Sequence, residues 1–551
     1  MANTLLDLFE KNPQLLEWRD KVTLLSRQLV MGFSGSSKAV VMASALSEQV
    51  PKILIVTSTQ NEAEQLTGDL SAILGEDKVY SFFADDVVAA EFIFASPEKT
   101  HSRLESLNFL MDKEPSGILV TSLVGTKLHL PNPEVYKDSR IDLTLGEEHD
   151  LEALSKHLTH IGYQRVEQVL SPGEFSRRGD ILDIYELTAE LPYRLEFFGD
   201  EIDGIRQFDS DSQKSLDNLE HIIVSPADDI ILTREDYQRA EKALESAVSK
   251  AEGPHKAYLE EVLSVTIDGY RHKDLRKFLS LFYDKAYTLF DYLPKGTPVF
   301  IDDFQKIVDR HGRLELEVAN LLTEDLHQGK SLSHLNYLVD SFKTLRNYQP
   351  ASFFSNFHKG LGNLKFDKLY QFKQYPMQEI FNQFPLLVDE IHRYTKNKAT
   401  VILQVGSEKQ LKSLKETLEE YDLDLPISSF GDLIPHKPQL VLGNLSNGFY
   451  FADEKLVLVT EREIFHKKVK RRARASHVSN AERLKDYNEL EKGDYVVHQT
   501  HGIGQFKGIE TIEIKGVHRD YLTIQYQDAA TISLPVEQIE SLSKYVSADG
   551  K

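Results

Sequence analysis

The sequence lacks cysteine entirely, which excludes disulfide bridges, thiol nucleophiles, iron–sulfur clusters and cysteine-ligated zinc within the chain. Long hydrophobic runs are also missing. The longest, such as Ile53–Val56 and Leu456–Val459, have the length of a strand and fall far short of the roughly 18 residues that a membrane span needs. The N-terminus shows neither the basic start nor the apolar centre of a signal peptide. We therefore expect a cytoplasmic protein with no membrane partner.

A net positive charge is missing as well, because 64 Lys and Arg face 86 Asp and Glu, giving a net charge of −22. Such a chain does not bind nucleic acid through its average field, so any contact with DNA needs a local basic patch. The run Lys467–Arg474, in which six of eight residues are basic, is one candidate. A solvated tether between domains explains this run equally well.

What is present is an alternation of α/β and β-rich segments over 551 residues, a length that suits three to five domains. Continuous apolar runs at 53–56 and 118–120 predict buried parallel strands, and hydroxyl and acidic residues at 58–62 predict a helix start. We predict a multidomain α/β fold that ends in a small β-barrel. Its parts are an α/β domain at 1–125, a β-rich insert at 126–212, a return to the first domain at 213–350, a second small α/β domain at 351–460, a basic linker at 461–483 and a C-terminal β domain at 484–551.

The segment Gly32–Ala39 resembles the phosphate-binding loop pattern G-x-x-x-x-G-K-[ST]. Gly32, Gly35 and Lys38 are present, but Ser37 replaces the second glycine of the pattern and Ala39 replaces the hydroxyl residue that ligates magnesium. Because alanine offers no oxygen to a metal, we predict no catalytic residue, no metal site and no cofactor in this chain. A decayed nucleotide site is the interpretation that we favour over a simple Ser/Gly-rich turn.

The apolar stretch Val299–Asp303 ends in acidic residues, as a magnesium-binding Walker-B strand does. Many strands end in aspartate at a turn, and Ala39 has already removed the other half of such a metal site. We therefore prefer the interpretation that this is an ordinary strand end.

Basic residues gather in the predicted insert at Arg165, Arg177 and Arg178, with Phe175 between them. Arginine guanidinium groups and aromatic rings are frequent anchors of protein interfaces, which favours an acidic protein partner. A solvated hairpin with ion pairs to the local carboxylates Glu174 and Asp180 is an equally good interpretation.

The C-terminal unit contains an alternating strand in which Leu522 and Ile524 share one face and Thr523 lies on the other. A strand near the edge of a small barrel can extend the sheet of another protein. The alternative is that Leu522 and Ile524 fill the core of the barrel. His498 and His501 have no cysteine or carboxylate cluster beside them, so they do not predict a metal site.

Three runs, at 171–184, 192–203 and 208–213, resemble bacterial transcription-repair coupling factors, and the first two also resemble the excinuclease protein UvrB. The motifs at 496–504 and 521–522 resemble the RNA-polymerase-interacting, Tudor-like domain that this family shares with CarD-type regulators. The resemblance covers essentially the whole chain and is least distinctive at about 350–460.

The resemblance implies a UvrB-like first domain interrupted by an insert that contacts the excinuclease protein UvrA, and a C-terminal domain that grips the β subunit of RNA polymerase. It implies the UvrA contact at Arg165, Phe175, Arg177 and Arg178, and β-strand pairing with polymerase at Leu522, Thr523 and Ile524. It also implies that the ATP- and magnesium-dependent translocase motor, which moves on upstream duplex DNA, is supplied by residues outside this chain.

The function that we expect is therefore recruitment: the chain would bind a stalled RNA polymerase and deliver UvrA for transcription-coupled nucleotide excision repair. Two alternatives stay open. A CarD-type regulator would bind polymerase alone and would need no UvrB-like insert. An active UvrB-like helicase would need a working phosphate loop, which Ser37 and Ala39 do not support.

Overall fold

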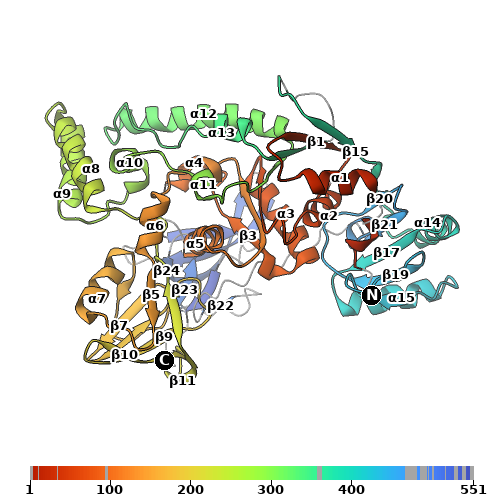
Figure 1. Ribbon diagram of the computed structural model, residues 1–551, viewed down its shortest axis with the longest axis horizontal. Coiled ribbons are helices and arrows are strands. Elements are labelled where there is room, and N and C mark those ends of the chain that lie inside the picture. The colour runs from red at the N-terminus through yellow and green to blue at the C-terminus, as the bar shows by residue number, and fades with distance from the viewer. Residues whose placement is uncertain are drawn as a thin grey trace. The chain divides into compact units, whose positions relative to one another are not determined.

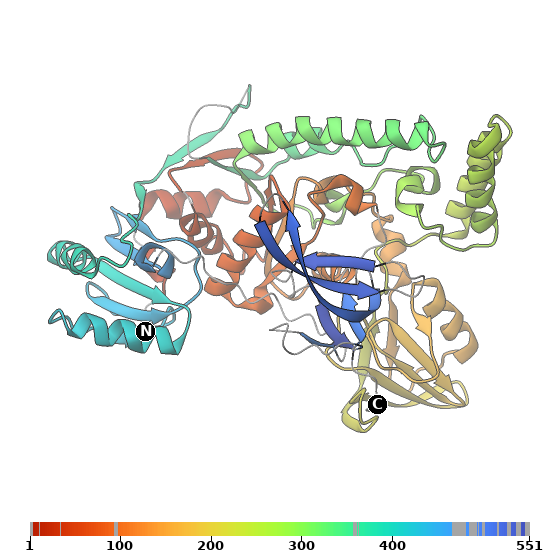
Figure 2. The same cartoon turned by 180° about the vertical axis from the view of Figure 1, so that it is seen from behind.

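The computed structural model describes most of the chain (Figures 1 and 2). The chain divides into two compact units. The first unit contains Met1–Ala95, His101–Arg140 and Asp228–Ala473, and the second contains Ser96–Thr100, Ile141–Ala227 and Arg474–Lys551. The described residues are 4–9, 12–33, 35–92, 97–355, 361, 363–465, 481–483, 493, 495–498, 502–514, 517–525, 531–535 and 542–545.

A seven-stranded sheet forms the centre of the first unit, and every pairing in it is parallel. The predicted strands at 53–56 and 118–120 lie within β2 and β4, and every residue of these two strands is buried. Strands from both sides of the insert build this one sheet, which continues beyond residue 350. In spatial order its members are β15 (Lys368–Gln371), β1 (Arg27–Met31), β14 (Ala351–Ser355), β13 (Val299–Asp302), β2 (Lys52–Thr57), β4 (Gly117–Ser122) and β3 (Val79–Phe82).

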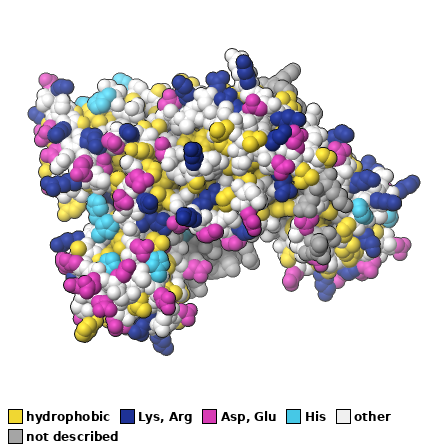
Figure 3. All heavy atoms as spheres, in the orientation of Figure 1, with side chains coloured by type: hydrophobic (Ala, Val, Ile, Leu, Met, Phe, Trp, Pro, Cys, Tyr) yellow, Lys and Arg dark blue, Asp and Glu magenta, His cyan; other side chains and the backbone are white. Residues whose placement is uncertain are grey.

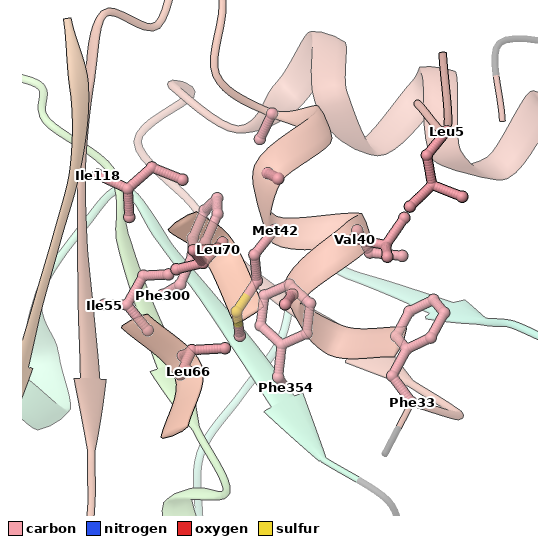
Figure 4. Packing of buried hydrophobic residues seen from close by; sticks show 14 of the residues in the cluster. Leu5, Phe33, Val40, Met42, Ile55, Leu66, Leu70, Ile118, Phe300 and Phe354 are labelled. Carbon is pink, nitrogen blue, oxygen red and sulfur yellow. The ribbon is translucent and has the colours of Figure 1, made fainter. Parts of the chain in front are cut away.

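Helices α2 (Ser36–Ser44) and α3 (Gln60–Leu74) pack on this sheet (Figure 4). Met42 points from α2 toward Phe300 and Phe354, which come from β13 and β14. The helix start predicted near residues 58–62 is confirmed, since the Thr59 side chain accepts a hydrogen bond from the Glu62 backbone N–H and so caps α3.

The domain built on this seven-stranded sheet, which we call the sheet domain, contains further helices. Its Leu-rich region 310–346 is not one continuous helix, because α12 (Phe304–His327) stops at His327 and the next helix begins at Phe342. Gly329 follows α12 with a φ of +68°, a conformation that ends a helix. The helices are α1 (Pro13–Lys21), α4 (Val88–Glu91), α5 (Pro97–Met111), α6 (Pro133–Ser139), α8 (Arg234–Val248), α9 (Gly253–Ile267), α10 (Leu275–Phe282), α11 (Leu289–Tyr292), α12 (Phe304–His327) and α13 (Phe342–Asn347).

A buried ion-pair network fixes the point where the chain returns from the insert. Asp229 accepts hydrogen bonds from Arg103 at 2.9 Å and from Arg276 at 2.6 Å, and Arg103 also contacts Glu91. Burial alone would raise the pKa of Asp229, but Arg276 and Arg103 outweigh it and hold that pKa well below its usual range. The charged carboxylate is therefore retained, and it anchors the returning chain to α5 and α10.

The second sheet of the first unit is six-stranded, with parallel strands at its centre and antiparallel strands at one end. The apolar runs at 401–403, 440–442 and 456–459 all lie in strands of this sheet. We call residues 374–465 the third domain. Its strands in spatial order are β16 (Gln374–Pro376), β20 (Phe449–Phe451), β21 (Leu456–Val459), β17 (Thr400–Val405), β19 (Pro438–Leu442) and β18 (Ile427–Ser428), and its helices are α14 (Phe384–Lys396), α15 (Glu408–Glu419) and α16 (Glu461–Phe465).

The insert is a six-stranded sheet with one helix on one face and a separate two-stranded sheet. Its elements run from residue 141 to 224, whereas the sequence predicts 126–212. The later end reflects the exposed strand β11, which shows no apolar alternation. The elements are β5 (Ile141–Thr144), α7 (Leu151–His160), β6 (Gln164–Arg165), β7 (Glu174–Arg178), β8 (Ile181–Ile184), β9 (Tyr193–Phe198), β10 (Glu201–Phe208), β11 (Ser215–Leu219) and β12 (His221–Val224).

The C-terminal strands form a six-stranded antiparallel sheet, drawn in dark blue in Figure 2. Its order ends at β22 and β26, and these two strands are not paired with each other among the described residues, so the predicted barrel is not shown. The basic run 467–474 and His501 lie outside the described residues. The strands in spatial order are β22 (Ala481–Arg483), β27 (Leu542–Tyr545), β23 (Tyr495–His498), β24 (Gly502–Ile514), β25 (Val517–Gln525) and β26 (Thr531–Pro535).

On the face drawn in Figure 3, Lys and Arg side chains are interspersed with Asp and Glu. In the described ranges, we find no helix with both the length and the apolar character of a membrane span.

Candidate functional site

The turn between β1 and α2 has the backbone of a tight loop. Gly32 has a φ of +100° and Gly35 a φ of +55°, values that favour glycine. A Cβ atom on Gly32 would lie 2.2 Å from the backbone oxygen of Phe372, so a larger residue does not fit there. The two glycines of the predicted loop are therefore required by its geometry.

Lys38 on α2 is held by a carboxylate. Its Nζ donates to both oxygens of Asp302, at 2.6 and 2.8 Å, and the two side chains are only 19% and 9% exposed. The structure thus brings together two motifs that the sequence presents separately, since Asp302 is the last residue of β13. Ser37 and Ala39 are fully buried, so neither presents a group to solvent.

The insert sheet has two different faces. Phe175 is fully buried in the core between the sheet and α7, together with Leu182 and Leu195. Arg177 lies on the same face, since alternate residues of a strand share a face, and its guanidinium donates to Glu152 of α7 at 2.7 Å. Phe175 therefore belongs to the core, which corrects the expectation that its side chain lies in a contact surface.

The opposite face, which we call the open face, carries Arg178, Arg194, Arg206 and Phe198. Cross-strand pairing aligns Asp183 with Arg194 and Arg194 with Arg206, which places these three side chains on one side of the sheet. Arg206 donates to Glu196 at 2.6 Å. The Phe198 side chain is 81% exposed, and no motif of the sequence singles it out.

Asp183 organises the charges of the open face. Its carboxylate is buried and accepts hydrogen bonds from Arg194 at 2.7 and 2.9 Å and from Arg178 at 2.9 Å. Hydrogen bonding to Asp183 raises the pKa of Arg194, whose guanidinium also lies 4.4 Å from the Phe208 ring centre. Arg178 remains 50% exposed and keeps donors available for carboxylates of another molecule.

The predicted alternative of local ion pairs is therefore realised in part, through Glu152 and Asp183 rather than through Glu174 and Asp180. Glu174 instead accepts backbone hydrogen bonds from Leu170 and Ser171. Arg165 is exposed on β6, at the end of the sheet order beside β7. Strand β6 ends at Arg165.

The predicted polymerase-binding residues lie inside their own sheet. Leu522 and Ile524 are fully buried, and β25 is paired with β24 on one side and with β26 on the other. The backbone of β25 is therefore not free to extend another sheet, and core filling describes these two side chains. Thr523 lies on the opposite face and is partly exposed. The strand at that end of the sheet order is β26.

A cavity of about 520 Å³ lies in the first unit, between α12 and the segment 335–340. Its lining includes Lys127, His129 and Tyr283. The Nε2 of His129 lies 2.8 Å from the backbone oxygen of Asn336, and its Nδ1 is buried without a hydrogen-bond partner. Burial lowers the pKa of His129, so its imidazole is neutral in the folded protein at neutral pH.

Three family models match this chain. Residues 141–229 match the UvrB interaction domain, residues 394–464 match the MFD D3 domain, and residues 490–546 match the CarD-like/TRCF RID domain. The first match covers the strands of the insert, and the second covers most of the third domain.

Curated relatives are similar over nearly the whole chain. The transcription-repair-coupling factor of Bacillus subtilis (strain 168) is 34% identical over 539 residues, which cover 96% of this chain and 46% of that protein. Those of Staphylococcus haemolyticus and of Staphylococcus aureus (strain bovine RF122 / ET3-1) are 30% and 29% identical, over 95% of this chain and 45% of each relative. The chain thus spans less than half the length of these relatives.

Proposed function

We propose that this chain, which is similar to transcription-repair-coupling factors over 96% of its length, is a docking platform for two macromolecules. The insert binds the excinuclease protein UvrA, and the C-terminal sheet binds the β subunit of RNA polymerase. The platform serves transcription-coupled nucleotide excision repair, and the ATP-driven motor that moves on upstream DNA is supplied by residues outside the chain.

The open face of the insert is the observation that carries the proposal. Arg178 is half exposed and is held in place by Asp183, while Phe198 presents its ring to solvent on the same face. An oriented guanidinium together with an exposed aromatic ring is the composition of an interface anchor for an acidic partner. We place Arg178 at the centre of the UvrA contact and Arg165 at its edge. Phe175 and Arg177 support the strand from the helix-covered face.

For polymerase, the burial of Leu522 and Ile524 shifts the proposed contact to the surface around them. Thr523 faces away from these two side chains, and β26 is the end strand that can pair with a strand of another protein. Leu522 and Ile524 support this surface by packing beneath it. The three residues thus contribute to the contact in different ways, with Thr523 partly exposed on the opposite face.

We also propose that this chain neither binds ATP or magnesium nor hydrolyses ATP. Lys38 forms an ion pair with Asp302, and the side chain of Ala39 has no oxygen that could bind a metal. The measurement is ATP turnover by the chain with and without duplex DNA. A DNA-stimulated turnover would favour a UvrB-like helicase instead.

A reciprocal pair of variants tests the two contacts. Arg178→Glu is expected to weaken binding of UvrA at least tenfold and to leave polymerase binding unchanged, whereas Thr523→Arg is expected to do the opposite. Arg393→Glu, at an exposed arginine of α14, is the matched charge-reversal control. If each variant weakened both interactions equally, or neither, the assignment of the two surfaces would be refuted.

A CarD-type regulator remains the second candidate, because the C-terminal match is named for both kinds of protein. Such a regulator would bind polymerase alone. The same binding assay separates the two candidates, since wild-type chain that binds polymerase without binding UvrA would favour the regulator.

A further inference from the structure

The turn between β1 and α2 is already covered by another part of the chain. The segment 444–448 links β19 to β20 in the third domain, and its Asn447 lies directly on Gly35. A Cβ atom on Gly35 would lie 3.0 Å from the Cβ of Asn447. The Asn447 backbone N–H donates to the Ser36 hydroxyl at 2.9 Å, at the first residue of α2. This is the helix end at which a phosphate-binding loop would hold its phosphate.

A buried carboxyl group ties the segment to both helices. Asp69 of α3 is 2% exposed, and one of its oxygens accepts from the Ser36 hydroxyl at 2.9 Å. The other oxygen accepts from the backbone N–H of Ser446 at 2.9 Å and from its hydroxyl at 2.7 Å. Asp69 thereby joins α2, α3 and the segment 444–448 through hydrogen bonds that are shielded from water.

Apolar side chains also pack between the third domain and the region of the turn and α2. Phe33, beside the turn, packs against Phe372 and Phe451 with ring centres 4.8 and 5.8 Å apart. One core cluster contains Val40 of α2 together with Leu445 and other side chains of the third domain. In Figure 4, Phe33 and Val40 lie away from Met42, which faces the seven-stranded sheet. Helix α2 is therefore buried between two sheets.

The charges around the turn disfavour a phosphate. Lys38 is the cation that would receive it, but Asp302 holds this side chain in two hydrogen bonds. Asp69 adds a carboxyl group beside the first residue of α2. An entering phosphate would have to displace Asn447 and compete with Asp302 for Lys38. The neutral segment 444–448 instead donates hydrogen bonds to Ser36 and Asp69 and adds no negative charge.

We propose that the segment 444–448 is the built-in occupant of the former phosphate-binding loop, and that the third domain serves as its cover. The loop has become an intramolecular docking site. Its position is set by the third domain and not by a nucleotide. The proposal does not depend on either macromolecular partner.

Hydrogen exchange of the full chain, read by mass spectrometry, tests the docking. In the wild type we expect slow exchange at the amides of Ser446 and Asn447. Asp69→Ala should speed exchange of 444–448 and of the first turn of α2 at least tenfold, with no change in α12. Asp112→Ala, which removes a carboxylate that pairs with Arg140 at 2.7 Å, is the control and should leave both regions unchanged.

Should Asp69→Ala unfold the sheet domain, Ser446→Ala replaces it. This variant removes one hydroxyl donor and retains the buried carboxyl group, so a threefold or larger rise in exchange confined to 444–448 and α2 is expected. Wild-type exchange rates at these sites in the folded variants would overturn the proposal.

A second measurement tests whether a nucleotide and the segment 444–448 compete for the phosphate position of the loop. Ser37→Gly with Ala39→Thr restores the residues of a phosphate-binding loop, and a fluorescent ATP analogue with magnesium is the probe. Either no binding, or binding accompanied by at least tenfold faster exchange at 444–448, is the expected result. Tight binding while 444–448 stays protected would show that the segment does not occupy the phosphate position and would overturn the proposal.

Discussion

The turn at α2 and the open face of the insert each place a basic side chain against an aspartate, yet the two pairs are left in different states. At the turn, Lys38 and Asp302 satisfy each other and are nearly buried. On the insert, Asp183 is shared by Arg194 and Arg178, so Arg178 stays 50% exposed. The comparison indicates when a basic side chain stays available to a binding partner. It does so when a second arginine shares its aspartate and when no other part of the chain covers the pair.

The largest expected effect comes from Phe175→Ala in the core of the insert. Removal of a fully buried phenyl ring should cost about 3–5 kcal/mol in the free energy of unfolding, because it leaves a cavity against α7. The measurement is urea denaturation followed by circular dichroism. A cost below about 1 kcal/mol would contradict the core position of Phe175.

Lys38→Met tests the closed pair at the turn. This change leaves Asp302 buried without its cation and should destabilise the sheet domain by about 3 kcal/mol. The double variant Lys38→Met with Asp302→Leu should recover most of that loss, since both charges are then gone. Equal losses in the single and double variants would argue that packing, and not the ion pair, matters at this place.

Arg178→Ala and Arg177→Ala compare the two faces of the insert directly. Loss of the half-exposed Arg178 should weaken UvrA binding by about 2 kcal/mol, or roughly 30-fold, because it removes an oriented anchor. Loss of Arg177, which is engaged by Glu152, should weaken binding less than about threefold. Isothermal titration calorimetry measures both, and the reverse order would place the contact on the helix-covered face.

The smallest expected effect is a dependence of the sheet domain on pH. Burial lowers the folded-state pKa of His129 below its usual value of 6.5, so the unfolded chain takes up a proton that the folded chain does not. Stability should therefore fall as the pH decreases below about 6.5. The midpoint of urea denaturation at pH 7.5 and pH 5.5 measures this, and His129→Gln should reduce the difference. An unchanged difference in the variant would assign the pH dependence to other groups.

Much of the local structure could be predicted because the pattern of each segment agrees with its surroundings. The apolar runs at 53–56 and 118–120 indicate buried strands, and both are buried on each face. The exposed strand β11 could not be predicted, since its side chains have no apolar alternation. The arginines stand out in the sequence as a group, but which of them face α7 and which face outward follows from strand register, which the sequence does not show.

By itself, the sequence determined the class of the protein: an acidic, cysteine-free α/β chain with a β-rich insert and a turn that resembles a phosphate-binding loop but has no hydroxyl to bind a metal. It determined these because residue type and short-range periodicity act locally. Only the tertiary structure decided that Asp302 meets Lys38, that Asp69 meets Ser446 and that Phe175 lies in a core. These contacts join residues that are distant along the chain, and side chains find such partners only when the strands and helices pack.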